Sequence, residues 1–212
     1  MFNIDKYQKI EEIIEKNKLR TKIIAVSKNQ SLEDINIAIS HKIRIFGENR
    51  VQEAENKFEN ILKNNKSIKL HLTGPLQTNK VKKALRIFSV FHTLDRDSLL
   101  KEFSKYPDII KNKSFFVQVN IGKEESKSGV HPDMLGDFLE KCASHNIPNI
   151  LGLMCIPPIN ESPKKHFYQL SEMLKQNGLK ELSIGMSGDY LDALEFNPSY
   201  VRIGTMLFGK RN

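Results

Sequence analysis

The segment KIIAVSKNQSLEDINIAIS at 22–40, followed by RIFGEN at 44–49, decides the fold. KIIAVS is a short, continuous apolar run, which is typical of a strand buried on both faces. Ser31 is expected to cap the helix that follows it, because a serine with an acidic residue three positions later is close to a capping box. The segment therefore predicts a strand–helix–strand unit.

The same unit recurs along nearly the whole chain. Seven further strands are predicted, at 44–49, 69–74, 89–94, 115–121, 149–156, 181–187 and 200–204. Helices are predicted at 3–19, 31–40, 51–65, 77–87, 97–106, 132–145, 162–177 and 189–195, with Pro107 ending the fifth of them. This alternation predicts an α/β fold, a (β/α)8 barrel that occupies residues 1–212 as a single domain with an extra N-terminal helix. An open doubly wound sheet is the alternative, but the sequence has no Gly-rich GxGxxG fingerprint.

The composition is that of an ordinary globular protein. Of the 212 residues, 39% are hydrophobic and 27% are charged. No stretch approaches the roughly 18 apolar residues of a membrane span, and residues 1–22 lack the apolar run of a signal peptide. Cys142 and Cys155 form neither a disulfide framework nor a metal-binding pattern. We therefore expect a cytoplasmic protein with no metal site and no membrane partner.

The formal net charge is +8, which raises the hypothesis of nucleic-acid binding. The 26 Lys outnumber the 7 Arg and are scattered along the chain. Proteins that read a base sequence favour the bidentate fork of arginine. The charge therefore indicates a basic, solvated surface and no specific nucleic-acid partner, with duplex or RNA binding as an alternative.

The active face of such a barrel is built at the C-terminal ends of its strands. Lys28 directly follows the first predicted strand. A lysine held there and partly desolvated can form a Schiff base with an aldehyde. A solvated loop lysine is the alternative, and a class I aldolase would use the same amine.

Two later segments predict a phosphate site. SIGMSG at 183–188 and RIGT at 202–205 supply small residues, backbone N–H groups and hydroxyls. Phosphate sites in barrels commonly form where the last two strand–helix loops meet. Ser187, Gly204 and Thr205 are the candidates, and a phosphorylated aldehyde would span them and Lys28. Two ordinary tight turns are the alternative.

Arg202 lies inside the last predicted strand. If it faces the mouth of the barrel, it can donate to a ring nitrogen, and because arginine keeps its proton it would make a pyridine ring a poor electron sink. A structural ion pair with Glu48 or Asp189 is the alternative.

Four further residues lie on or at the ends of predicted strands. Asn49 is the last residue of the second strand, and Met154 and Met186 lie near the ends of the sixth and seventh. The methionines fit packing better than chemistry. His71, on the third strand, is equally a hydrogen-bonded core histidine or an acid–base group.

Eight motifs in this order resemble those of the pyridoxal phosphate homeostasis proteins, which are single-domain barrels related to the N-terminal domain of alanine racemase. They are AVSK at 25–28, FGENRVQEA at 46–54, HLTGPLQTNK at 71–80, HTLD at 92–95, VNIGKEESKSG at 119–129, GLMCIPP at 152–158, SIGMSGD at 183–189 and VRIGTMLFG at 201–209. The chain departs from the family pattern at Arg50, Leu70 and Lys123, which puts surface contacts and partner choice in doubt.

The resemblance implies covalent binding of pyridoxal 5′-phosphate (PLP) to Lys28 as an internal aldimine. It places Ser187, Gly204 and Thr205 at the phosphate and Arg202 at the pyridine nitrogen. It places Asn49 beside the cofactor and His71 and Met154 in the same pocket. The expected cofactor-binding residues are Lys28, Asn49, His71, Met154, Met186, Ser187, Arg202, Gly204 and Thr205.

The resemblance further implies a non-catalytic carrier that holds, buffers or delivers PLP, with PLP-dependent apoenzymes as partners. A monomer is expected. An amino-acid racemase or related Lys-aldimine enzyme is the alternative. A racemase needs a second base, which in the related racemases comes from a second domain of the partner subunit. The sequence runs eight residues past Gly204, to Asn212, and on this basis no such second domain is expected.

Overall fold

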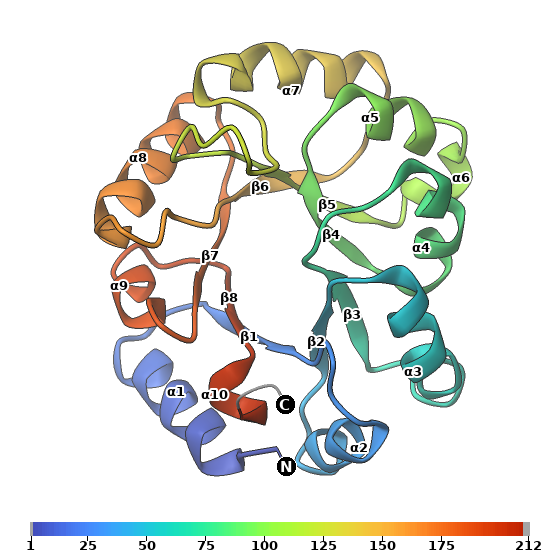
Figure 1. Cartoon of the computed structure of the whole chain (residues 1–212), viewed down its shortest axis with the longest axis vertical. Coiled ribbons are helices and arrows are strands. Elements are labelled where there is room, and N and C mark those ends of the chain that lie inside the picture. The colour runs from blue at the N-terminus through green and yellow to red at the C-terminus, as the bar shows by residue number, and fades with distance from the viewer. Residues whose placement is uncertain (1, 210–212) are drawn as a thin grey trace.

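A computed structural model describes residues 2–209. Eight parallel strands close into a barrel in chain order, and the helices surround it (Figure 1). The strands are β1 (Lys22–Val26), β2 (Ile45–Glu48), β3 (Lys69–Leu72), β4 (Val90–Leu94), β5 (Ser114–Gln118), β6 (Ile150–Met154), β7 (Glu181–Met186) and β8 (Tyr200–Ile203). The predicted (β/α)8 barrel is confirmed, as is the N-terminal helix that precedes it.

The helices follow the predicted order with two differences. They are α1 (Ile4–Lys16), α2 (Leu32–Ser40), α3 (Val51–Asn64), α4 (Val81–Ile87), α5 (Asp97–Phe103), α6 (Pro107–Ile110), α7 (Leu135–Ser144), α8 (Pro163–Gln176), α9 (Tyr190–Leu194) and α10 (Thr205–Phe208), and short 3₁₀ turns Thr78–Lys80 and Pro132–Met134 precede α4 and α7. The Ser31 cap is confirmed, since its Oγ accepts the N–H of Asp34 at 3.0 Å. Pro107 begins α6, because proline is favoured in the first turn of a helix. Helix α10 lies in a segment for which no helix was predicted.

The core has two layers because side chains alternate across each strand. The outer layer lies between the strands and the helices and holds most of the phenylalanines, including Phe46, Phe91 and Phe115. The inner layer fills the barrel and includes Phe116 and Met154. The barrel interior is therefore packed, and space for a ligand is left at its ends.

Helix α1 lies beside α10, as Figure 1 shows. The N–H of Asn3 donates to the carbonyl of Leu207 at 2.7 Å, and the Phe2 and Phe208 rings meet edge to face with their centroids 5.2 Å apart. The N-terminal helix thus fixes the turn that follows β8, at the C-terminal end of the barrel.

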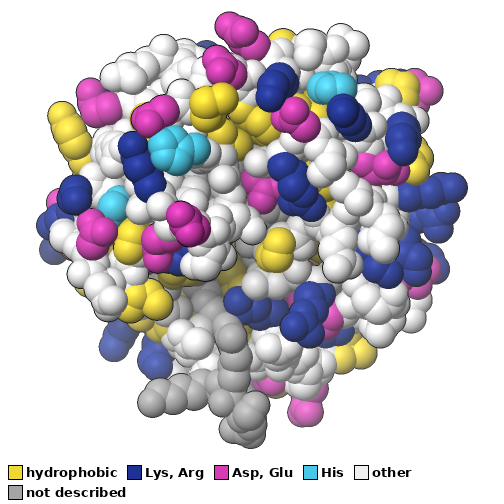
Figure 2. Space-filling view, turned by 45° about the horizontal axis from the view of Figure 1, so that its top comes forward, with side chains coloured by type: hydrophobic (Ala, Val, Ile, Leu, Met, Phe, Trp, Pro, Cys, Tyr) yellow, Lys and Arg dark blue, Asp and Glu magenta, His cyan; other side chains and the backbone are white. Residues whose placement is uncertain are grey.

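None of the described helices is long and apolar enough to cross a membrane. Within residues 2–209 no cluster of three or more His, Cys, Asp or Glu side chains is arranged to hold a metal ion. Cys142 and Cys155 are buried free thiols. On the face that Figure 2 shows, basic and acidic side chains are interspersed.

Candidate functional site

A cavity of about 260 Å³ lies at the C-terminal ends of the strands. Residues from β1, β2, β3, β7 and β8, or from the loops after them, line it together with Ile156 after β6. Seven of the nine predicted residues lie on its wall: Lys28, Asn49, Met186, Ser187, Arg202, Gly204 and Thr205. The structure therefore brings three predicted features into one cavity: the amine of Lys28, the residues expected to bind a phosphate, and the arginine expected to donate to a ring nitrogen.

Lys28 is half-buried, and the backbone on both sides of it is held by helix α3. The ammonium of Lys57 donates to the carbonyl of Ser27 at 2.7 Å. Glu53 accepts the N–H of Asn29 at 2.5 Å and pairs with Lys57 at 2.9 Å. Asn29 has a left-handed backbone (φ 59°), a conformation that asparagine tolerates better than most residues. The loop that carries Lys28 is therefore clamped on both sides.

A fully buried carboxylate completes this clamp. Oε1 of Glu48 accepts the Ser27 hydroxyl at 2.6 Å and pairs with the Lys57 ammonium at 2.7 Å. Oε2 has no hydrogen-bond partner among the described residues. Burial raises the pKa of Glu48 above its ordinary value, while the nearby Lys57 opposes the rise. The network behind Lys28 is thus a desolvated ion pair whose two members depend on each other.

The residues that were predicted to bind a phosphate lie in the turns after β7 and β8. Ser187 Oγ accepts N–H groups from Gly204 and Met206, both at 3.3 Å, so these donors point toward the same place as the hydroxyl. The carboxylate of Asp189 accepts the N–H of Met186 at 2.5 Å and fixes the start of the β7 turn. One hydroxyl and several backbone N–H groups are the donors that a phosphate group needs.

Arg202 faces the interior of the barrel, and its side chain reaches the cavity floor. One terminal nitrogen donates to the carbonyl of Ser183 at 2.6 Å and to its hydroxyl at 2.9 Å, and the other donates to the carbonyl of Cys155 at 2.9 Å. These acceptors are all uncharged. Burial lowers the pKa of Arg202 from its ordinary value, yet a guanidinium stays protonated at neutral pH.

The alternative of an ion pair for Arg202 is wrong for the described structure. No ion pair joins Arg202 to Glu48 or Asp189 among residues 2–209. Glu48 points away from the barrel interior, toward helix α3, where it pairs with Lys57. The charge of Arg202 is therefore available to a ligand in the cavity.

His71 and Met154 do not line the cavity, in contrast to the expectation. His71 is fully buried inside the barrel, where its ring contacts His92 and Tyr200. Met154 packs with Val90 and Phe116 in the inner layer. Both face the barrel axis, but they lie below the cavity floor.

Two apolar residues of the cavity wall were not among the residues predicted from the ends of the strands. Val26 ends β1 on the face that points into the barrel, and Ile156 follows β6 with its side chain exposed. Asn49 is held by Thr73, another wall residue, whose hydroxyl donates to Oδ1 of Asn49 at 2.9 Å. Because alternate residues of a strand point into the barrel, the inward direction of Val26 and Thr73 could be predicted from their positions. Ile156 lies in a loop, where no such alternation applies.

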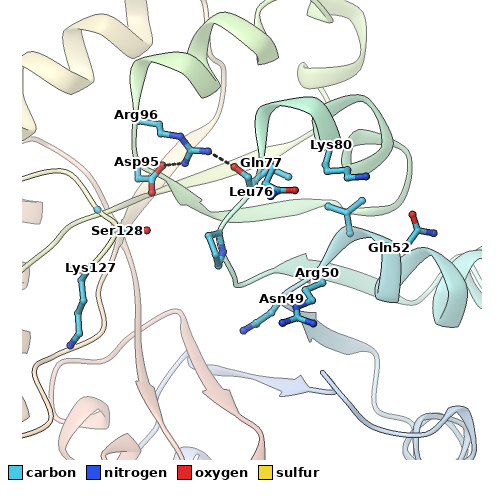
Figure 3. A pocket seen from close by; sticks show the side chains of 13 residues that line it. Asn49, Arg50, Gln52, Leu76, Gln77, Lys80, Asp95, Arg96, Lys127 and Ser128 are labelled. Carbon is cyan, nitrogen blue, oxygen red and sulfur yellow. Dashed lines mark hydrogen bonds and ion pairs between the residues drawn. The ribbon is translucent and has the colours of Figure 1, made fainter. Parts of the chain in front are cut away.

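A larger cavity of about 950 Å³ adjoins the first and shares Asn49 with it. Its wall carries four cations and one carboxylate: Arg50, Lys80, Arg96, Lys127 and Asp95. Figure 3 shows Lys127 across the cavity from Lys80, and Arg96 bonded to both Asp95 and the carbonyl of Leu76. The entrance beside the candidate site is therefore positively charged.

Acid is expected to destabilise the fold through the two buried histidines. Burial lowers the pKa of His71 to about 3 and that of His92 well below its ordinary value. In the unfolded chain both histidines bind a proton near pH 6.5, whereas in the folded chain they stay neutral. The free energy of unfolding therefore falls as the pH drops below 6.5. From pH 7.5 to 5, His71 should lower the free energy of unfolding by about 2 kcal/mol, and His92 should lower it in the same direction.

Urea unfolding across this pH range measures the effect. H71N should flatten the pH dependence by one histidine's share, whereas H131N, at an exposed position, should leave it unchanged. An equal pH dependence for wild type and H71N would show that His71 takes up its proton as readily in the folded protein as in the unfolded chain, which would contradict the lowered pKa.

The chain matches the family model "Alanine racemase, N-terminal domain" over residues 5–212. It is 36% identical over 202 residues to a pyridoxal phosphate homeostasis protein of Aquifex aeolicus, covering 90% of this chain and 87% of that one. It is 34% identical over 204 residues to the protein of the same name from Pasteurella multocida, again covering 90% and 87%.

Solved structures give the same grouping. PipY of Synechococcus elongatus with PLP bound has a TM-score of 0.79 and 32% identity, covering 90% of this chain and 93% of that one. PipY without PLP has a TM-score of 0.81. An alanine racemase from Bartonella henselae is 17% identical, with a TM-score of 0.70 over 90% of this chain and 56% of its own. That last likeness shows the barrel fold alone.

Proposed function

This chain belongs to the alanine racemase N-terminal domain family and, within it, to the pyridoxal phosphate homeostasis proteins, and on this premise we propose that it binds PLP in the cavity beside Lys28. One observation carries the proposal: Lys28, Ser187 and Arg202 line a single cavity although they are far apart in the sequence. Lys28 offers an amine to the aldehyde, Ser187 offers a hydroxyl to the phosphate, and Arg202 offers N–H donors to the ring nitrogen. These are the three contacts that PLP requires.

The residues fit the chemistry of the cofactor. Bound PLP supplies an aldehyde and a pyridine ring. Lys28 forms a Schiff base with this aldehyde: its nitrogen makes the C=N bond, and the aldehyde oxygen leaves as water. Ser187 and the N–H groups of Gly204 and Thr205 hold the phosphate, while Asn49 and Met186 border the ring. Arg202 donates to the ring nitrogen and keeps it unprotonated.

The proposed role is to hold, buffer or deliver the cofactor without turnover. Lys28 is the one amine, imidazole, thiol, phenol or carboxyl group among the described wall residues of this cavity. A racemase needs a base on each face of the substrate. The donor-only Arg202 also leaves the ring a poor electron sink. Both points support a carrier over an amino-acid racemase.

The carrier hypothesis is tested with the purified protein and PLP. Titration should produce a yellow absorption band that saturates at one PLP per chain, and borohydride should bleach it. The loaded protein should not exchange the α-proton of alanine or other small amino acids with D₂O. Exchange that K28A abolishes would make the protein an enzyme and overturn the carrier role.

Delivery to PLP-dependent apoenzymes, by a monomer in the cytoplasm, completes this proposal. The cavity opens at the C-terminal face of the barrel, so the cofactor would leave there. A loaded chain should reactivate an apoenzyme faster than PLP released into solution does. Equal rates at every concentration would reduce the role to buffering.

The cationic entrance should accelerate PLP capture. Reversing two of its charges in the R50E/K80E double variant should slow association about tenfold at low salt and much less at high salt, because electrostatic steering is screened. Stopped-flow recording of the yellow band measures the rate. K66E/K175E changes the net charge equally at positions away from both cavities and should associate at the wild-type rate. An unchanged rate in R50E/K80E would remove the entrance from the mechanism.

A further inference from the structure

A chain of hydrogen bonds runs through the barrel interior below Arg202. Arg202 donates to Oγ of Ser183 at 2.9 Å. That oxygen lies 2.9 Å from Nδ1 of His92, and Nε2 of His92 lies 2.9 Å from Nδ1 of His71. Each of these four residues is at most 5% exposed. The proposed function uses only the first of them.

The donor at one end determines the direction of every bond in the chain. A guanidinium has only N–H donors, so Ser183 Oγ accepts from it. Besides Arg202, Nδ1 of His92 is the one hydrogen-bond partner of Ser183 Oγ among the described residues, so the hydroxyl proton donates to it. With Nδ1 an acceptor, a neutral His92 carries its proton on Nε2. That N–H donates to Nδ1 of His71, so His71 carries its proton on Nε2, a buried atom with no hydrogen-bond partner among the described residues.

The surroundings keep both rings neutral and in place. Desolvation lowers the pKa of both histidines, with Lys69 and Lys22 acting in the same direction on His71 and Arg202 on His92. His92 stacks on Phe116 with 4.7 Å between ring centroids and 4° between planes. Tyr200 meets both imidazoles edge to face. Ring rotation that would break the chain is therefore blocked by packing.

We propose that Ser183 and His92 are positioning residues, which hold the guanidinium of Arg202 at the cofactor's ring nitrogen through a hydrogen-bond chain of one fixed direction that ends in two Nε2–H histidines. The role at the ring rests on the proposed PLP binding, whereas the direction of the chain does not. Because each bond in the chain polarises the next, turning the guanidinium away would disturb all of them together.

Imidazole NMR tests the direction of the chain without any cofactor. Long-range ¹H–¹⁵N spectra of the wild-type protein at pH 7.5 distinguish a protonated ring nitrogen from an unprotonated one, and H71N assigns the signals. We expect both His71 and His92 to be neutral with the proton on Nε2. A proton on Nδ1 of either ring, a mixture of tautomers or a charged ring would overturn the chain.

Ser183→Ala tests the positioning role. The variant should still form the Schiff base with PLP, but the absorption band should shift and the affinity for PLP should fall about tenfold, the size expected for losing one hydrogen bond to a charged group. His92 should then show both tautomers. S183T should restore the band because it restores the hydroxyl.

Ser89→Ala is the matched control, since the Ser89 hydroxyl donates to the carbonyl of Leu70 at 3.1 Å and lies outside the chain. It should bind PLP as the wild type does. A wild-type band and affinity in S183A would refute the positioning role. If wild-type protein fails to bind PLP at all, the proposed function fails, and the tautomers still decide whether the chain exists.

Discussion

Lys28→Ala is expected to abolish the yellow absorption band of the PLP-loaded protein completely. No other amine lies on the described wall of the cavity, so no second residue can replace the covalent bond. Ser187 and Arg202 should still hold PLP weakly. The residual affinity should be lower by about two orders of magnitude, because the covalent bond between Lys28 and the aldehyde is lost.

Equilibrium dialysis and absorption spectra measure both parts of this effect. K66A removes an exposed lysine that lies away from both cavities and should keep the band and an affinity close to that of the wild type. Unfolding in urea should show that K28A remains folded, because the clamp on its loop uses the backbone of Ser27 and Asn29. A yellow K28A protein would place the Schiff base on a different lysine.

Lys57→Met should cause a large loss of stability. The substitution keeps the length of the side chain but removes the charge that faces the fully buried Glu48. Removing one member of a buried ion pair costs about 3–5 kcal/mol, because the remaining charge has no partner. The backbone of the Lys28 loop also loses its bond to Ser27, so PLP affinity should fall as well.

The pH dependence of this loss identifies its cause. Without Lys57, the pKa of Glu48 in the folded protein rises further above its value in the unfolded chain. The loss of stability is therefore complete at pH values above the folded-state pKa of Glu48, and it disappears at pH values below the unfolded-state pKa. Urea unfolding of K57M should therefore show a smaller deficit at pH 5 than at pH 7.5.

Two variants complete the K57M test. E48Q/K57M, which removes both charges, should recover much of the stability. K63M removes an exposed lysine from the same helix and should unfold like the wild type. A K57M protein as stable as wild type at pH 7.5 would mean that Glu48 is protonated in the native state.

The fold could be predicted almost completely because its signals are local. Each strand is a short apolar run and each helix has an apolar stripe, so the order of elements, and with it the barrel, follows from the sequence. Helix α10 was missed because four residues carry no helical period. Pro107 was misplaced because proline both ends one helix and begins the next.

The site was predictable where it depends on position at a strand end. Lys28, Ser187 and Gly204 lie within two residues of the ends of their strands, so the barrel itself brings them together. His71 and Met154 differ because depth along the barrel axis is set by strand stagger, which the sequence does not display.

Residues that support the site were harder to foresee. The clamp by Lys57 depends on a long side chain that reaches 30 positions back in the sequence to Ser27. The chain from Arg202 to His71 joins strands β8, β7, β4 and β3 across the barrel. Both networks arise from packing between distant segments, and a single sequence gives no spacing rule for such contacts.

The central claim is that PLP bonds to Lys28 in the cavity at the mouth of the barrel. Borohydride reduction of the PLP-loaded wild-type protein, followed by mass spectrometry of its peptides, tests this claim most directly. The account predicts one reduced pyridoxyl phosphate group per chain, on the peptide that contains Lys28. A modification on any other lysine, or an unmodified protein after loading and reduction, would contradict it.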